Sequence, residues 1–228
     1  PGDSLFELAE RLNIDELVIA PDERRGGLPM EEMLNCVQRG ISVIDLSTFF
    51  EREAGKIKLG IVDPSWLVFS DGFDRRQWRQ VTKRAFDMAA STILLLLAAP
   101  LMLLTALAIW LESGFKGPII YRQERVGEGG RAFTVLKFRS MRTDAEKDGK
   151  AVWAQKDDDR ITTVGRVIRK LRIDELPQVF NVLRGDMSFV GPRPERPCFV
   201  ADLSKQIPYF GLRHCVKPGI TGWAQLRY

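Results

Sequence analysis

The chain has 228 residues, of which 28% are charged and 45% hydrophobic, enough for one or two ordinary globular domains. Its formal net charge of +4 and its isoelectric point near 9.1 favour anionic partners: nucleic acid, phosphorylated small molecules or anionic lipid. Three cysteines without a Cys-x-x-Cys spacing argue against a disulfide framework and a zinc site, and they suit a reducing compartment. The single histidine, His214, excludes a multi-histidine metal cluster.

The first 60 residues alternate between expected helices and expected short strands. Apolar positions recur at helical spacing in SLFELAERLN and PMEEMLNCVQRG, and short apolar runs in IDELVIAP and ISVIDL predict strands. This alternation indicates an α/β fold, here a partial Rossmann-like domain over residues 1–70. No Gly-x-Gly-x-x-Gly follows a strand, so a dinucleotide site is not supported, and we expect a regulatory or dimerising domain.

A basic linker helix is expected over residues 71–82, and it leads into a long apolar segment. Residues 88–111 form a run of 24 residues without a charge, which as a straight helix is long enough to cross a bilayer. Trp78 and Trp110, near the ends of this segment, suit an interfacial belt. The cations just ahead of the run are Arg75, Arg76, Arg79, Lys83 and Arg84.

Pro100 and the flanking charges decide how we expect the apolar segment to lie. Pro100 sits in its middle, where it removes a backbone hydrogen bond and kinks a helix. Cations flank both ends, with Lys116, Arg122 and Arg125 following the segment, whereas a spanning helix should show a strong charge asymmetry. We therefore expect a membrane re-entrant helical hairpin over residues 83–115 that bends at Pro100. A straight transmembrane helix and a buried core helix of a soluble protein are the alternatives.

The remainder, residues 116–228, predicts a small and mainly helical α+β domain. GPIIYRQERVG and RAFTVLKFRSM are expected to form two strands joined by the glycine-rich turn at 127–130. TTVGRVIRKLR and LPQVFNVLRG predict helices, the second with Pro177 in its first turn and Gly185 at its end. SFVGPRPERP is expected to be extended or turn-like. Residues 142–160 predict an exposed loop, in which Asp157 to Asp159 suggest a solvated turn more than a second metal site.

Two adjacent carboxylates, Asp174 and Glu175, follow five cations that lie between residues 160 and 172 without an acid among them. On a helix, neighbours in sequence point about 100° apart, so the pair is better arranged for two separate tasks than for sharing a proton. One oxygen would reach a substrate and the other a metal, while nearby arginines keep both ionised and grip a pyrophosphate. The alternative is an ordinary charged helix face, with Lys170 paired to Asp174 and Arg172 to Glu175. The apolar segment and the Pro-Arg-Pro nearby favour the phosphate site.

Several long motifs in one order resemble the bacterial sugar transferases, also called monotopic phosphoglycosyl transferases. The resemblance covers residues 83–228 through KRAFDMAAS, RVGEGGRAFTVLKFRSM, IDELPQVFNVLRGDMSFVGPRP and KPGITGWAQ. The front part, with TFFEREAGKI and PSWLVFSDGF, resembles the end of the α/β regulatory domain of large members. Against those members we expect this chain to be shortened at both ends. Ala99 departs from some small members, which have serine before the proline.

The resemblance implies transfer of a sugar-1-phosphate from a UDP-sugar to undecaprenyl phosphate, with release of UMP. By position, Asp174 would be the nucleophile of a covalent aspartyl-phosphosugar intermediate and Glu175 a ligand of Mg²⁺. The strand alternation that places Lys137 and Arg139 on one face also has a purely structural reading. The cations expected to contact phosphate are Arg169, Arg193, Lys137 and Arg139.

The family also implies partners and a location. The expected partners are the UDP-sugar donor, undecaprenyl phosphate and membrane lipid, with no nucleic acid, and the partial α/β domain suggests a homodimer. The catalytic domain, residues 116–228, is expected at the cytoplasmic face of a bacterial inner membrane. A membrane-bound Mg²⁺-dependent phosphatase or pyrophosphatase, and a membrane-tethered module that binds anionic ligands, are the alternative functions. Whether the sugar is glucose, galactose or an N-acetylated sugar is left open.

Overall fold

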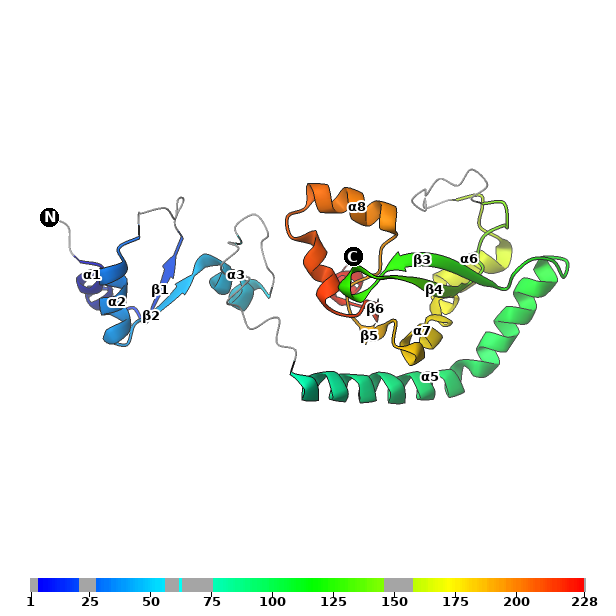
Figure 1. Cartoon of the computed structure of the whole chain (residues 1–228), viewed down its shortest axis with the longest axis horizontal. Coiled ribbons are helices and arrows are strands. Elements are labelled where there is room, and N and C mark those ends of the chain that lie inside the picture. Colours follow the sequence, from blue (N-terminus) through cyan, green and yellow to red (C-terminus); the bar gives the residue numbers. More distant parts are fainter. Residues whose placement is uncertain (1–3, 21–27, 56–61, 63–75, 146–157, 228) are drawn as a thin grey trace. The chain divides into compact units, whose positions relative to one another are not determined.

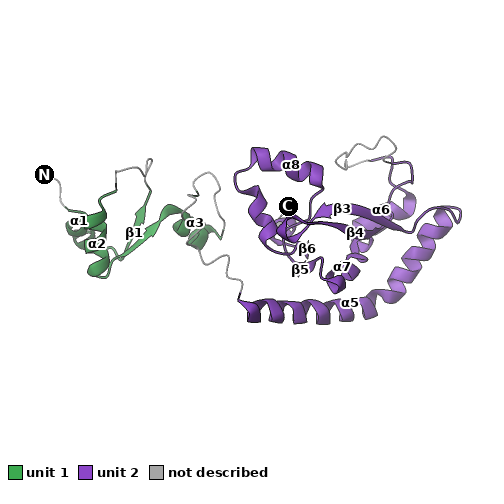
Figure 2. Ribbon diagram, viewed as in Figure 1, with its two compact units in different colours: residues 1–72 green, residues 73–228 purple. Residues whose placement is uncertain are grey.

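The computed structural model describes residues 4–20, 28–55, 62, 76–145 and 158–227, and its chain divides into two compact units, 1–72 and 73–228 (Figures 1 and 2). The second unit contains most of the predicted linker helix, the apolar segment and the predicted catalytic domain. Arg75, Asp157 and the motif PSWLVFSDGF lie outside the described residues.

The first unit alternates helices and strands as predicted. Strands β1 and β2 pair in parallel, with Glu16 opposite Ser42, and a helix connects them. Their small core consists of Ala9, Cys36 and Ile41. The α/β alternation is therefore present, and the Rossmann-like detail stays a prediction. The elements are α1 (Leu5–Arg11), β1 (Glu16–Ile19), α2 (Met30–Gln38), β2 (Ser42–Asp45) and α3 (Leu46–Ala54).

The second unit mixes helices with two small sheets, β3 with β4 antiparallel and β5 with β6 parallel. The two predicted strands and the glycine-rich turn that joins them are confirmed: β3 and β4 form a β-hairpin with its turn at η3 (Figure 1). Its elements are α5 (Gln77–Glu112), β3 (Ile120–Val126), η3 (Glu128–Gly130), β4 (Ala132–Phe138), α6 (Thr163–Lys170), η4 (Ile173–Glu175), α7 (Gln178–Arg184), β5 (Ser188–Val190), α8 (Pro197–Gln206), η5 (Phe210–Cys215), β6 (Gly219–Thr221) and α9 (Trp223–Arg227), where η marks a 3₁₀ turn.

Helix α5 is one continuous helix of 36 residues that runs through Pro100. We expected a linker helix over residues 71–82 and a separate helical hairpin over residues 83–115. These helix boundaries were wrong, because a single helix, Gln77–Glu112, runs across the expected boundary between the two ranges. Figure 1 shows α5 bent, so that its first and last parts point in different directions. A proline removes a single backbone donor, and the rest of the hydrogen-bond ladder is enough to continue the helix with a bend.

One narrow stripe of α5 is buried against its unit, and the other residues of α5 are exposed or half-buried. In the most apolar 18-residue window of α5, mean hydropathy is 2.5 and only 11% of the residues are buried, unlike the mostly buried core helix of a soluble protein. By length and composition it is suited to a membrane. The buried residues lie at spacings of four and seven, which places them on one face: Asp87, Ser91, Ala98, Thr105 and Ile109.

Polar contacts attach the N-terminal part of α5 to the unit. Asp87, which is 2% exposed, accepts hydrogen bonds from Ser188 Oγ and Phe189 N, both at 3.0 Å. The Arg84 guanidinium donates to carbonyls at the end of α7, one of them Leu183 O at 2.7 Å. These contacts connect α5 to β5 and α7.

The C-terminal part of α5 is attached to the same unit by other contacts. Ile109 packs with Phe138 of β4 and Ile168 of α6 in a buried cluster. Glu112 accepts a hydrogen bond from Val164 N at 3.1 Å. The N-terminal and C-terminal parts of α5 therefore both pack against the second unit.

Candidate functional site

The carboxylate pair lies in a 3₁₀ turn between α6 and α7. Arg172, directly ahead of it, has a left-handed backbone with φ of 59°. The turn ends at Glu175, and Pro177 caps α7, so the predicted order of pair, proline and helix is confirmed. A 3₁₀ turn has three residues per turn, so consecutive side chains point about 120° apart. The two carboxylates therefore meet different surroundings.

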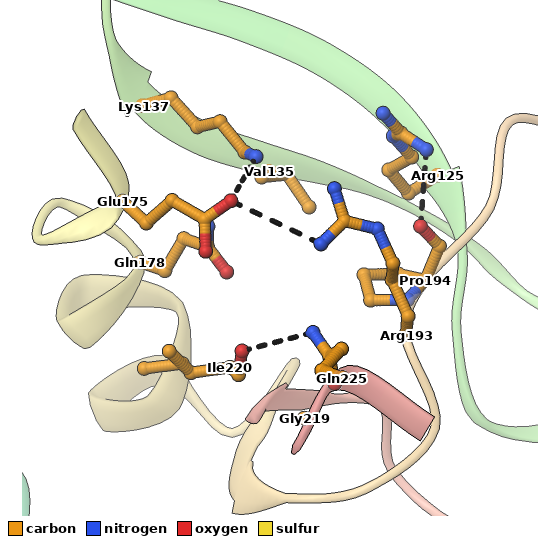
Figure 3. Close-up of a pocket in the computed structure, with 10 residues that line it drawn as sticks. All are labelled: Arg125, Val135, Lys137, Glu175, Gln178, Arg193, Pro194, Gly219, Ile220 and Gln225. Carbon is orange, nitrogen blue, oxygen red and sulfur yellow. Dashed lines mark hydrogen bonds and ion pairs between the residues drawn. The ribbon is translucent and has the colours of Figure 1, made fainter. Parts of the chain in front are cut away.

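Glu175 is the centre of a cation cluster built from three segments. Its Oε1 accepts a hydrogen bond from Lys137 Nζ of β4 at 2.8 Å (Figure 3). Arg193 Nη1 lies 4.0 Å from the same oxygen, and Arg172 Nη1 lies 3.9 Å from it. Burial pulls the pKa of Glu175 upward, but the charge and hydrogen bond of Lys137 outweigh it with the help of the two arginines. The pKa of Glu175 is therefore lowered, and the carboxylate stays ionised.

Asp174 has the opposite electrostatics. Its Oδ1 is buried and has no hydrogen-bond partner within the part of the chain that the structure describes. Burial raises the pKa of Asp174 above its ordinary value, and the charge of Glu175 adds to the rise, although Lys137 and Arg169 act against it. A buried acceptor without a partner is costly to the fold. Such an oxygen is suited to take a ligand or an electrophile.

A small pocket that is open to solvent lies beside Glu175 (Figure 3). It brings together Lys137, Glu175 and Arg193 of the predicted site residues. The other lining residues were not predicted. From the sequence, Arg125 stands out only as a cation that flanks the apolar segment, and KPGITGWAQ only as a family motif. The lining residues that were not predicted as site residues are Arg125, Val135, Gln178, Pro194, Gly219, Ile220 and Gln225.

The structure places other predicted residues outside the lining of this pocket, among them Asp174, although its neighbour Glu175 lines it. Arg169, in the last turn of α6, acts on Asp174 through its charge. Arg139 follows the end of β4, is 9% exposed, and packs its guanidinium against Gly117. It therefore does not share the pocket with Lys137. Pro100 lies inside α5.

The alternative explanation, an ordinary charged helix face, required two local ion pairs, and the described structure contains only one of them. The Arg172–Glu175 pair exists at 3.9 Å, although the Arg172 side chain is 77% exposed and the contact is weak. Lys170 makes no ion pair with Asp174 in the described part of the chain. The strong partner of Glu175 is Lys137, which is 38 residues away. A local helix pattern therefore does not explain the pair.

The described residues contain no group of three or more His, Cys, Asp or Glu that would hold a metal alone. Mg²⁺, however, often takes one or two carboxylates and completes its shell with water and substrate phosphates. Two oxygens meet that need: Asp174 Oδ1, which lacks a hydrogen-bond partner among the described residues, and Glu175 Oε2, since the contacts of Glu175 with Lys137, Arg172 and Arg193 are made through Oε1. The donor set therefore fits Mg²⁺ only together with a phosphate ligand.

The profile of the family described as bacterial sugar transferase matches residues 78–228. A UDP-N-acetylgalactosamine-undecaprenyl-phosphate N-acetylgalactosaminephosphotransferase of Aeromonas hydrophila is 55% identical over 144 residues, which are 63% of this chain and 33% of the relative. An undecaprenyl-phosphate glucose phosphotransferase of Komagataeibacter xylinus is 51% identical over 153 residues, 66% of this chain and 28% of the relative. The match thus spans about a third of the length of these relatives. This chain belongs to the bacterial sugar transferase family.

Proposed function

We propose that this chain carries the catalytic part of an enzyme that transfers a sugar-1-phosphate from a UDP-sugar to undecaprenyl phosphate and releases UMP. The observation that supports it is the Asp174–Glu175 pair. Glu175 lines a pocket together with Lys137 and Arg193, and its neighbour Asp174 has a buried oxygen without a hydrogen-bond partner among the described residues. The relatives are named for this class of reaction. The cations suit a diphosphate, and the carboxylate suits covalent chemistry.

The first step would use Asp174 as the nucleophile. Its carboxylate oxygen attacks the phosphorus that carries the sugar, an O–P bond forms, and the bond to UMP breaks. UMP leaves with the electron pair, and an aspartyl-phosphosugar remains. Lys137 and Arg193 bind the phosphoryl oxygens and stabilise the charge that develops on them. No proton is needed at Asp174, because the ionised form attacks.

The second step would return the enzyme to its starting state. An oxygen of undecaprenyl phosphate attacks the same phosphorus, and the bond to the Asp174 oxygen breaks. The carboxylate is restored, and the product is a polyprenyl diphosphate sugar. Mg²⁺, when bound through Glu175 and phosphate, would neutralise negative charge on the transferring group. Glu175 is suited to this role because its lowered pKa keeps it ionised.

The lipid acceptor requires a site at the depth of the head groups. We propose that α5 inserts into one leaflet and that both of its ends lie at the same membrane face, because its N-terminal and C-terminal parts both contact the second unit. A straight crossing would need that unit on both sides of the bilayer. The re-entrant placement keeps the pocket at the interface and open to a soluble donor. The cytoplasmic face and a homodimer stay predictions.

Replacement of the nucleophile tests the proposal. We expect Asp174→Asn to lower UMP release by about a thousandfold or more, because removal of a covalent nucleophile abolishes both steps. The assay uses the protein in nanodiscs with undecaprenyl phosphate, Mg²⁺ and a panel of UDP-sugars. Asp202→Asn, an exposed aspartate of α8, is the matched control. Near-normal turnover by Asp174→Asn would refute the assignment, and free sugar phosphate as product would indicate a hydrolase instead.

A further inference from the structure

The segment that carries Arg193, residues 192–195, is held by an unusual set of donors. We refer to these four residues as the strap. Every backbone carbonyl of the strap accepts a hydrogen bond, in a stretch that has no regular secondary structure. The donors, in order from residue 192 to residue 195, are Gly219 N at 3.0 Å, Arg213 Nη2 at 2.6 Å, Arg125 Nη1 at 3.0 Å and Val126 N at 2.9 Å.

The composition of the strap explains why side chains take part. Pro192 and Pro194 have fixed φ angles and no backbone N–H, so the strap cannot form an ordinary two-sided ladder. Its position therefore depends on what donates to its carbonyls. Two of those donors are guanidinium groups, Arg125 and Arg213. Both side chains belong to half-buried residues, and this burial lowers the pKa of each guanidinium.

The strap presents one side chain to the candidate site. Arg193 lines the pocket and reaches within 4.0 Å of Glu175 Oε1 (Figure 3). Its side chain is 41% exposed, so neighbours do not enclose it and its direction depends on the backbone from which it leaves. Arg213 bonds the carbonyl of Arg193 itself. A guanidinium held in place before the ligand arrives loses less conformational entropy when it binds phosphate.

We propose that Arg213 is a positioning residue, which fixes the strap so that Arg193 points at the phosphate of the donor. The inference rests on the proposed transferase function for its substrate and on the strap contacts for its geometry. Arg213 does not line the pocket, so it acts through Arg193 and not on the ligand directly. A purely structural role is the competing explanation, because the Arg213 guanidinium also lies over the Phe210 ring at 4.6 Å.

A double-mutant cycle separates the two explanations. Arg213→Met removes the donors but keeps a long stem over Phe210, and Arg193→Ala removes the side chain that would be positioned. We expect Arg213→Met to lower kcat/KM for UMP release about tenfold in the parent chain and less than twofold in the Arg193→Ala background. Arg213→Lys, which keeps a donor, should recover part of the loss. Arg131→Met, at an exposed arginine of the hairpin turn, is the control.

The same double-mutant cycle can also be measured on ligand binding, which does not require the enzyme to turn over a substrate. Titration calorimetry with inorganic pyrophosphate, on the full chain in detergent micelles, should show weaker binding in Arg193→Ala. Arg213→Met should weaken binding only while Arg193 is present. An equal loss in both backgrounds, or no loss in the parent chain, overturns the proposal. If no UDP-sugar gives UMP, the transferase function fails, and the pyrophosphate cycle still decides whether Arg213 acts through Arg193.

Discussion

Asp174 and Glu175 are neighbours in the chain, yet their surroundings shift their pKa values in opposite directions. Lys137 acts on both, but it donates a hydrogen bond only to Glu175. The carboxylate with the raised pKa is the more basic and the more reactive oxygen nucleophile. The carboxylate with the lowered pKa is the better permanent anion for a cation. At the scale of single residues, the site therefore divides two roles between two adjacent acids.

A pH profile tests that division. Asp174 must be ionised to attack, so we expect kcat/KM for UMP release to fall as the pH drops through its raised pKa. Lys137→Met removes a cation that lowers this pKa, and the acid limb of the profile should move to higher pH. Lys137→Arg keeps the charge and should leave the limb near its original position. An acid limb that is the same in Lys137→Met and the parent would contradict the assignment.

The same shifts predict opposite effects on stability. A carboxyl with a raised folded pKa destabilises the fold as the pH rises through that pKa, so Asp174→Asn should raise the melting temperature at pH 7. The gain should shrink as the pH falls through the raised pKa. Glu175 has a lowered folded pKa and stabilises the fold above its ordinary pKa, so Glu175→Gln should lower the melting temperature at pH 7. Thermal unfolding in micelles measures both, and a lower melting temperature for Asp174→Asn would count against the buried charge.

Sequence patterns located the two acids but not their partners. The Arg172–Glu175 contact follows from a spacing of three residues and was foreseeable. The Lys137–Glu175 hydrogen bond joins a strand to a turn 38 residues later, and no local pattern encodes that meeting. Arg139 was expected beside Lys137 because strand side chains alternate, but β4 ends at Phe138, so the alternation no longer applies at Arg139.

Helix α5 does at least two things at the scale of elements: it exposes an apolar surface and it holds the segments that carry the site. Its Arg84 bonds the end of α7, which begins just after Glu175. Its Asp87 bonds β5, which leads to the strap and Arg193. The placement of the apolar helix α5 and the geometry of the pocket are therefore connected through a few buried polar contacts.

Removal of the Asp87 side chain tests this connection. Asp87→Ala leaves Ser188 Oγ and Phe189 N without their acceptor in a buried place, so we expect a loss of about 2–4 kcal/mol in the free energy of unfolding. Asp87→Asn keeps an acceptor oxygen and should cost less. Asp202→Ala, on exposed α8, should change stability by less than about 0.5 kcal/mol. Denaturant unfolding in micelles gives the values, and equal stability of Asp87→Ala and the parent would show that this contact contributes nothing.

Elements with a local signal were predicted well. Helix α7 has Pro177 ahead of it and Gly185 at its end with φ of 94°, as a left-handed helix cap requires. Helix α8 was missed because Pro197 was read as the end of an extended segment, although proline at the first position of a helix is also common. The β5–β6 pairing was missed because parallel strands meet through a long connection that leaves no local pattern.

The molecule as a whole consists of two compact units, and all the site residues described above belong to the second. The family profile begins at residue 78, just after the second unit begins. The two units divide at residue 72, where the sequence changes from an α/β pattern to a basic segment, and the domain boundaries expected from the sequence stay predictions. The continuity of α5 through Pro100 was not foreseeable, since proline sequences permit both a bend and a break.

The membrane placement of α5 is testable with two engineered cysteines. Gln77→Cys and Lys116→Cys stand on either side of the apolar segment, in a chain whose accessible Cys198 and Cys215 are replaced by serine. Cys36 is fully buried and is kept. An impermeant maleimide added to intact cells should label neither position, and after permeabilisation it should label both. The contacts at Asp87 and Glu112 hold both flanks to one unit, and that unit cannot lie on two sides of a bilayer.

A third cysteine gives the control for depth. Leu104→Cys lies on the exposed apolar face of α5 and should resist the reagent in membranes, because the reagent does not enter hydrocarbon. In detergent-free denaturant the same position should react, which shows that the thiol is competent. Labelling of position 77 from one side and position 116 from the other would contradict the re-entrant placement. It would require the hydrogen bonds at one end of α5 to break on insertion, and the pocket would then lose its support from either α7 and β5 or α6.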